Sequence, residues 1–177
     1  MMFQPAIQEG LFQMRTSPLV EPWSIMQIPL EIRPANLTDA GSISELVRSV
    51  AQSCLGADAR PILNTVSPAT IESCIQNPIY SYALGFLDGE LVGMAAMREK
   101  KHFYHLFVSP EYHCKGIAKS LWQHLKSDAV SSGINMFTVN SSIFAVPVYK
   151  KFGFLPTSEP QTKNGIHYVH MQLSVPG

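Results

Sequence analysis

Residues 106–118 read LFVSPEYHCKGIA: a hydrophobic strand-like run, a short loop that contains Pro110, and the start of a helix. The first turn of that helix holds Gly116 and Ala118 and carries almost no side chain. The first N–H groups of a helix lack partners within the helix, and the helix dipole adds positive potential there. Small residues let a phosphate or pyrophosphate approach these groups. A single Gly-x-Ala turn is also typical of tight packing alone, so the surrounding sequence must decide.

The residues before this stretch predict antiparallel strands. Two strand-like runs, 80–87 and 90–97, flank Asp88-Gly89, a pair typical of a two-residue type I′ hairpin turn. A charged turn, 98–101, then leads into a strand over 102–108. Three consecutive antiparallel strands are therefore expected to lead into the Gly-x-Ala turn.

Hydrophobic spacing predicts helices before and after these strands. Ile43, Leu46, Val47 and Val50 follow the i, i+3, i+4, i+7 pattern of a helix with one buried face, over 40–54, after the capping residues 38–39. Further helices are predicted at 69–76, 115–131 and 144–152, with 56–68 as a loop and Gly153 ending the last helix. Strands at 28–34, 136–139, 154–156 and 166–173 complete the order βααβββαβαββ, a mixed α/β fold.

Composition limits the class of protein. The 177 residues suit one domain, predicted at 28–175, and 46% hydrophobic content is enough for a folded core. Thirteen Lys and Arg balance thirteen Asp and Glu, so no overall positive field favours nucleic acid or an anionic membrane. No apolar run is long enough to span a membrane.

In residues 1–27 hydrophobic residues follow neither the repeat of a helix nor the alternation of a strand. This segment is therefore predicted to be a poorly ordered tail or a packed arm. Three cysteines without a CxxC pair favour reduced thiols and a cytoplasmic location.

Two separated motifs resemble those of the GNAT superfamily of N-acetyltransferases. That family's loop reads Arg/Gln-x-x-Gly-x-Gly/Ala, and this chain has His113-x-x-Gly116-x-Ala118. A second motif is similar to the stretches 139–142 (VNSS), 145–149 (AVPVY) and 153–154 (GF). The resemblance covers about residues 28–173 and includes the element order, and the C-terminal stretch is similar to that of largely uncharacterised bacterial members. It implies a mostly antiparallel GNAT-type sheet flanked by helices.

The resemblance also implies a cofactor site. Acetyl-CoA would lie in a V-shaped gap between the strand ending at Val108 and the strand ending at Asn140. The main chain of Phe107 and Val108 would pair with the pantetheine amides, with Asn140, Ser142 and Tyr149 beside that arm. His113 stands where the family usually has Arg or Gln, and Ser142 where many members have Asn. The pyrophosphate would bind the N–H groups of the turn, Cys114, Lys115, Gly116, Ile117, Ala118 and Lys119.

Proton chemistry suggests catalytic roles. An amine attacks a thioester only as the neutral base, and the leaving thiolate must gain a proton. Tyr149 suits the second task, because a phenol with a pKa of about 10 stays protonated at pH 7 and can protonate a thiolate whose thiol pKa is about 8.5; packing of the last helix is the competing interpretation. His102 suits the first task, with an imidazole pKa of about 6.5. Tyr104 is a further catalytic candidate beside it, because strand alternation places His102, Tyr104, Leu106 and Val108 on one face. A plain surface histidine is an equal alternative.

Other chemistries fit the sequence less well. His102 and His105, like His167 and His170, are three apart on predicted strands, so each pair is expected on opposite faces and a metal site is not predicted. The turn lacks GxGxxG spacing and a P-loop lysine, which argues against dinucleotide and ATP sites. The resemblance therefore implies an acetyl-CoA-dependent N-acetyltransferase that moves the acetyl group directly to a primary amine of a small molecule, peptide or protein, compatible with a homodimer. A non-catalytic acyl-CoA-binding regulatory module and an interaction protein using residues 1–27 are the alternatives.

Overall fold

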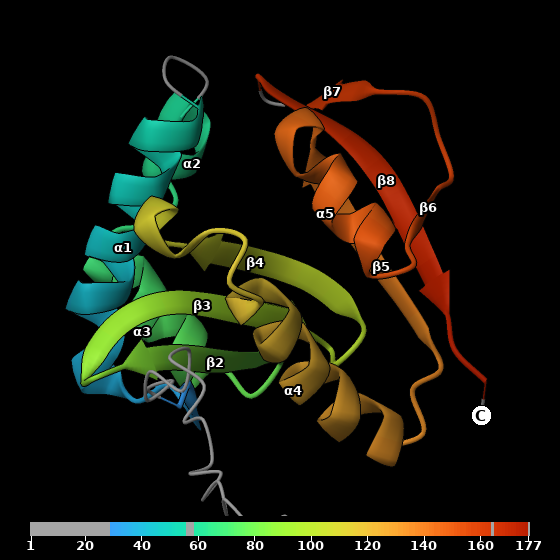
Figure 1. Cartoon of the computed structure of the whole chain (residues 1–177). Helices are drawn as coiled ribbons and strands as arrows, with labels where there is room; N and C mark the ends of the chain where they lie inside the picture. The colour runs from blue at the N-terminus through green and yellow to red at the C-terminus, as the bar shows by residue number, and fades with distance from the viewer. Residues whose placement is uncertain (1–28, 56–58, 164, 177) are drawn as a thin grey trace, which may run out of the picture.

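The computed structural model describes residues 29–55, 59–163 and 165–176. The predicted tail, residues 1–27, lies outside the described residues. The strands are β1 (Glu31–Pro34), β2 (Tyr80–Leu87), β3 (Glu90–Arg98), β4 (His102–Val108), β5 (Met136–Ser142), β6 (Leu155–Pro156), β7 (Gln161–Lys163) and β8 (Ile166–Ser174). They form one sheet in the order β1-β2-β3-β4-β5-β8-β6, with β7 paired to β8 (Figure 1). Among the strand pairs of the described residues, only β4–β5 is parallel.

The helices are α1 (Ala40–Leu55), α2 (Arg60–Leu63), α3 (Pro68–Gln76), α4 (Ile117–Ser131) and α5 (Val146–Lys151). Short 3-10 turns precede three of the elements: η1 (Leu37–Asp39), η3 (Pro110–Tyr112) and η4 (Ile143–Ala145). The predicted mixed, mostly antiparallel fold flanked by helices is confirmed. The structure adds two short elements to the predicted order: α2, within the segment predicted as a loop, and β7.

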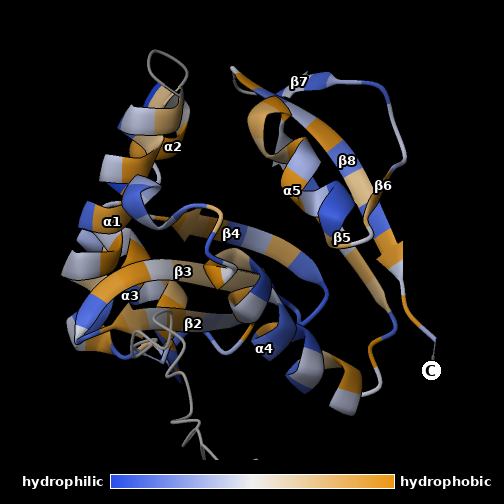
Figure 2. Ribbon diagram, in the orientation of Figure 1, coloured by the Kyte–Doolittle hydropathy of each residue, from blue (hydrophilic) through white to orange (hydrophobic). Residues whose placement is uncertain are grey.

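Two hydrophobic cores lie on opposite faces of the sheet. The first lies under α4 and α5 and contains Phe103, Leu121, Trp122 and Phe137. The second lies under α1 and α3, where the predicted helix face of Ile43, Leu46, Val47 and Val50 is buried as expected. Figure 2 shows hydrophobic colours along much of β2 and β3, which have helices on both faces, and hydrophilic colours on β7.

Local turn chemistry explains how the strands and the first helix are joined. Asp88 and Gly89 both have positive φ angles, 51° and 77°, as the predicted I′ hairpin turn requires. The prediction that residues 38–39 cap the first helix is confirmed for Asp39, whereas the N-cap itself is Asn36. Asn36 accepts the Thr38 N–H, and Asp39 accepts the Asn36 N–H in return, which forms a capping box at η1.

A close approach between β3 and α4 positions the start of that helix. A Cβ on Gly93 would lie 3.1 Å from Ile117 Cγ2 and 3.2 Å from Leu121 Cδ1. Glycine therefore lets the first turns of α4 lie directly on the sheet, beside the end of β4.

Among the described residues, no helix is both long and apolar enough to cross a membrane.

Candidate active site

β4 and β5 part almost as soon as they meet. They pair only through His102 with Thr138 and Phe103 with Val139, near the start of β4. Figure 1 shows the two strands diverging from that point, β4 toward α1 and β5 alongside β8. The remainder of β4 therefore has no β5 partner within the described chain, which is the splayed arrangement that the sequence predicts.

The register between β3 and β4 decides which main-chain groups face this gap. Ser109 N–H donates to the Val92 carbonyl at 2.9 Å, so Val92 and Ser109 form a hydrogen-bonded pair. Such pairs alternate along an antiparallel ladder. Phe107, opposite Met94, is therefore bonded to β3, whereas Val108, opposite Gly93, and Leu106 turn their N–H and C=O groups toward the gap. The prediction for Val108 agrees with this register; the prediction for Phe107 was wrong, and Leu106 takes its place.

The helix after the gap offers free N–H groups. Gly116 is the N-cap of α4, with φ of 84°, and no side chain caps that end of the helix. Cys114 also has a positive φ, 61°, so the loop turns sharply twice just before the helix. Residues 113–116 and Lys119 are exposed, and Ala118 is half-buried. The Gly-x-Ala turn thus has open space above it, since a Cβ on Gly116 would meet nothing within 4 Å.

His113 takes part in a contact that the motif comparison did not predict. Its Nε2 lies 2.8 Å from the carbonyl oxygen of Val108, so the ring closes the loop back onto the end of β4. A carbonyl oxygen carries two lone pairs, and that of Val108 can accept a second hydrogen bond from a ligand in the gap. The η3 turn in the same loop is anchored by the Tyr112 hydroxyl, which donates to Glu90 at 2.9 Å.

Tyr149 lies in the core beneath the gap. It is 6% exposed, and its ring packs edge-on against Phe103, Phe152 and Phe154 at centroid distances of 5.6–6.1 Å. Burial raises the pKa of its phenol well above the ordinary value. The hydroxyl has no hydrogen-bond partner among the described residues, so the group is both firmly protonated and free to donate.

A β-bulge in β4 overturns the predicted alternation of side chains. Ala96 is opposite His105 and Met97 is opposite Phe103, which leaves Tyr104 as an extra residue. As a result Phe103, Leu106 and Val108 share the α4 core, while Phe107 packs under α1 and α3. The sequence prediction that His102, Leu106 and Val108 share a face was therefore wrong, because alternation holds only in an unbroken ladder.

His102 lies at the vertex of the gap. Its Nδ1 is 2.8 Å from the Thr138 hydroxyl, and the ring is half-buried. Burial lowers its pKa below the ordinary value, and the charges of Arg98 and His170 act in the same direction. His102 is thus neutral at pH 7, and in the tautomer whose Nδ1 donates to the Thr138 hydroxyl the other nitrogen, Nε2, can accept a proton.

The β5 arm carries the other predicted residues. Ser142 caps η4, where its hydroxyl accepts the Ala145 N–H at 3.3 Å. Asn140 Oδ1 lies 2.8 Å from His170 Nδ1 on β8, a contact that the sequence could not show because it joins residues thirty positions apart.

The metal argument from the sequence was partly wrong. The bulge brings His105, opposite Ala96, onto the same face of the sheet as His102, opposite Arg98, although the two were expected on opposite faces. The described residues contain no group of three or more His, Cys, Asp and Glu side chains that could hold a metal ion. Burial lowers the pKa of His105 to about 4, so its ring is neutral.

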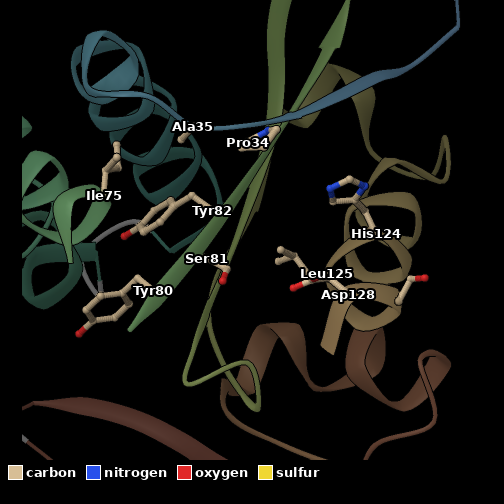
Figure 3. Close-up of a pocket in the computed structure, with 10 residues that line it drawn as sticks. Pro34, Ala35, Ile75, Tyr80, Ser81, Tyr82, His124, Leu125 and Asp128 are labelled. Atoms are coloured by element: carbon tan, nitrogen blue, oxygen red, sulfur yellow. The ribbon is translucent and has the colours of Figure 1, made fainter. Parts of the chain in front are cut away.

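A separate groove follows the outer edge of β2, beyond the end of β1. It has a volume of about 610 Å³ and lies between α3 and α4, with His124 and Asp128 on one wall. Figure 3 shows Tyr80 and Tyr82 turned away from that wall, toward Ile75 of α3. β3 and β4 lie between this groove and the gap, so the groove does not belong to the splayed site.

The fold is shared with solved acetyltransferase structures at low sequence identity. A GCN5-related N-acetyltransferase from Rhodopseudomonas palustris is 18% identical, with a TM-score of 0.69 over 82% of this chain and 95% of that one. The paia N-acetyltransferase of Thermoplasma acidophilum, in complex with coenzyme A, is also 18% identical, with a TM-score of 0.69 over 82% and 99%. The yncA protein of Salmonella typhimurium, a putative acetyltransferase with acetyl-CoA, is 18% identical, with a TM-score of 0.66 over 84% and 95%.

No curated protein matches the chain in sequence. The family model described as an acetyltransferase (GNAT) domain matches residues 50–175, which include the splayed strands, the Gly116 turn and Tyr149. The chain therefore belongs to the GNAT family of acetyltransferases.

Proposed function

We propose that the chain is an N-acetyltransferase that moves the acetyl group of acetyl-CoA directly to a primary amine. The observation that carries this proposal is the junction of the β4–β5 gap with the uncapped start of α4. The gap offers the main chain of Leu106 and Val108 to an extended amide-containing arm, and the helix offers free N–H groups to a pyrophosphate. Coenzyme A has these two parts in one molecule, and relatives of the same fold hold it.

Residues around the vertex of the gap can assist the attack of the amine and the departure of the thiolate. The amine nitrogen attacks the thioester carbon, the C–S bond breaks, and an N–C bond forms. In this proposal His102 accepts the proton that the amine loses, directly or through one water molecule. Tyr149 donates a hydrogen bond to the departing sulfur, because its raised pKa keeps the phenol protonated. The thiolate takes up one proton from solvent and His102 releases one to solvent, which balances the reaction and restores both groups.

Binding and turnover are tested separately. The purified chain is titrated with acetyl-CoA by calorimetry, and free thiol release is then measured with a broad panel of primary amines. Saturable binding with amine-dependent thiol release supports the transferase. Tight binding without release from any amine supports a non-catalytic acyl-CoA-binding module, and failure to bind at all would leave the splayed gap without its proposed ligand.

A further inference from the structure

One continuous row of side chains crosses the sheet at the vertex of the gap. The pairing of neighbouring strands aligns Tyr80 with Arg98, Arg98 with His102, His102 with Thr138, and Thr138 with Gln172. Directly paired residues share one face, with Cβ atoms of an antiparallel pair about 4.5–5.5 Å apart. This vertex row therefore presents five neighbouring side chains, each half-buried or exposed, on the face where α1 and α3 lie.

Arg98 is the one charged member of the vertex row, and its guanidinium is largely free. Its Nε lies 3.6 Å from Glu99 Oε1, a loose contact. The other oxygen of Glu99 lies 2.9 Å from the Lys101 ammonium, which is the closer partner of that carboxylate. No other ion pair or side-chain hydrogen bond engages the Arg98 guanidinium among the described residues. The two Nη atoms can thus bind a carboxylate in the two-point geometry that suits arginine.

Aromatic rings form a wall on one side of Arg98. Tyr104, the bulged residue, is 41% exposed, and its ring lies 5.2 Å from that of Tyr80 and 4.3 Å from that of His105. Arg98 is paired directly with His102 across β3 and β4, and the bulged Tyr104 follows two residues later on β4. The vertex row thus combines one free cation, an aromatic wall and a neutral proton acceptor.

We infer that Arg98 binds a carboxylate carried by the acceptor amine, so that the acceptor class is that of amino acids. This inference rests on the proposed transferase function and adds its specificity. A carboxylate held by Arg98 brings the attached amine next to His102, its partner across the strands. The row itself contains no carboxylate, so it offers no counter-charge to a second ammonium group and disfavours di- and polyamines.

The test compares matched acceptors in matched proteins. Thiol release from acetyl-CoA is measured with a set of amino acids and with their α-carboxamides, over a range of pH that corrects for the different amine pKa values. The proteins are wild type, Arg98→Met, Arg98→Lys and, as a control, Arg48→Met, which removes an exposed arginine of α1. Circular dichroism and acetyl-CoA titration check that each variant is folded and binds acetyl-CoA.

Wild type is expected to prefer the free acids by at least about tenfold in kcat/KM, which corresponds to about 1.4 kcal/mol. Arg98→Met should abolish this preference through a higher KM for the acids. Acetyl-CoA binding should be unchanged, and the rate with the carboxamides should change only through the upward shift of the His102 pKa. Arg98→Lys should keep part of the preference, because it keeps the charge without the planar fork, and Arg48→Met should keep all of it.

The two proposals fail in different ways. Equal rates with acids and carboxamides in wild type, or a preference that survives in Arg98→Met, would overturn the carboxylate site and leave the transferase standing. Acetyl-CoA binding without thiol release from any amine would overturn the transferase and the inference that rests on it.

Discussion

The hydroxyl of Tyr149 can be removed with little change to its surroundings, because the ring alone makes the aromatic contacts in the core. Tyr149→Phe should therefore leave acetyl-CoA binding nearly unchanged and lower kcat on the order of tenfold, about 1.4 kcal/mol of barrier. The effect should fall on kcat more than on KM, since the hydrogen bond strengthens as charge develops on sulfur. Steady-state kinetics under conditions where chemistry limits turnover provide the measurement.

Thermal unfolding of the same variant separates catalysis from packing. Without a partner for the hydroxyl, the free energy of unfolding should change little. Wild-type turnover in Tyr149→Phe would show that the residue only packs, and a loss of several kcal/mol of stability would show a structural role for the hydroxyl.

The base assigned to His102 predicts a pH profile. Only the neutral imidazole accepts a proton, so kcat should fall as pH drops through the pKa of this group. Because burial and the Arg98 charge lower that pKa, the acid limb should lie below the ordinary value of about 6.5. His102→Ala should lower kcat about 10²-fold at pH 7 and remove this limb.

His170→Ala is the companion variant, because His170 is the other histidine whose charge acts on His102. The His170→Ala variant should keep the acid limb, and the limb should shift to a slightly higher pH, because one cause of the lowered His102 pKa is removed. An acid limb that persists in His102→Ala and disappears in His170→Ala would assign the base to His170.

Individual residues differed in how far the sequence could place them. Gly116 and Tyr149 belong to local motifs, so the sequence alone could single them out as candidates. Arg98 and Leu106 gave no signal of a site, because their importance comes from cross-strand pairing with β2, β3 and β4. A hydrophobic pattern in the sequence does not indicate which main-chain N–H and C=O groups are hydrogen-bonded to a neighbouring strand.

The first turn of α4 provides the cofactor prediction at the scale of an element. Gly116→Leu should weaken CoA binding by at least about tenfold, because the new side chain occupies the open space above the free N–H groups. Calorimetric titration of coenzyme A measures the loss. Unchanged affinity in a folded variant would contradict the assignment of this turn.

Gly133 offers a matched control at the other end of the same helix. It has nearly the same φ, 85° against 84°, and a Cβ there also meets nothing within 4 Å. Both leucine variants should lose about 1–2 kcal/mol of stability from the left-handed backbone. Only Gly116→Leu should lose coenzyme A.

The turn before α1 predicts a pH-dependent contribution to stability. Asp39 accepts two hydrogen bonds from the Arg33 guanidinium at 2.8 Å and one from the Asn36 N–H, which lower its pKa. A lowered pKa means that this stabilisation is present above the pKa of an unfolded aspartate and is lost as pH falls through the folded value. Asp39→Asn should cost about 1 kcal/mol at pH 7, since water screens part of the pair.

Chemical denaturation at pH 7 and at pH 2 measures this difference, which should be smaller at the lower pH. Asp128→Asn is the control, because its pair with Lys100 is more exposed, with side-chain exposures of 61% and 43%. A similar loss in both variants, or a loss that is undiminished at pH 2, would contradict the role of Asp39.

Helices and turns could be predicted from the sequence where residues close together in the chain determine them. The buried face of α1 and the Asp88-Gly89 turn depend on residues within one or two turns of chain, and both predictions are confirmed. The bulge at Tyr104 depends on how β4 aligns with β3, a tertiary property. One extra residue in β4 was enough to change which of its side chains lie on the same face of the sheet as His102.

At the scale of the whole molecule, the sheet is two parts joined at a narrow seam. β1–β4 pair continuously, as do β5 and β8, yet only two residue pairs connect β4 to β5. A ligand that pairs with β4 and contacts β5 continues the sheet across this seam. The resemblance predicted the gap itself. The main-chain groups that face the gap could be identified only from the β3–β4 register.

Hydrogen exchange can test this register directly. The N–H groups of Leu106 and Val108 face the gap, whereas that of Phe107 is bonded to β3, by the alternation that the Ser109–Val92 hydrogen bond establishes. Saturating acetyl-CoA should slow exchange at Leu106 and Val108 by at least about tenfold more than at Phe107. Ligand binding also slows exchange wherever it depends on global unfolding, so β3 amides such as Met94 provide the reference. Equal slowing at 106, 107, 108 and 94 would indicate global stabilisation without pairing, and selective slowing at Phe107 would place the ligand on the wrong edge of β4 for this site.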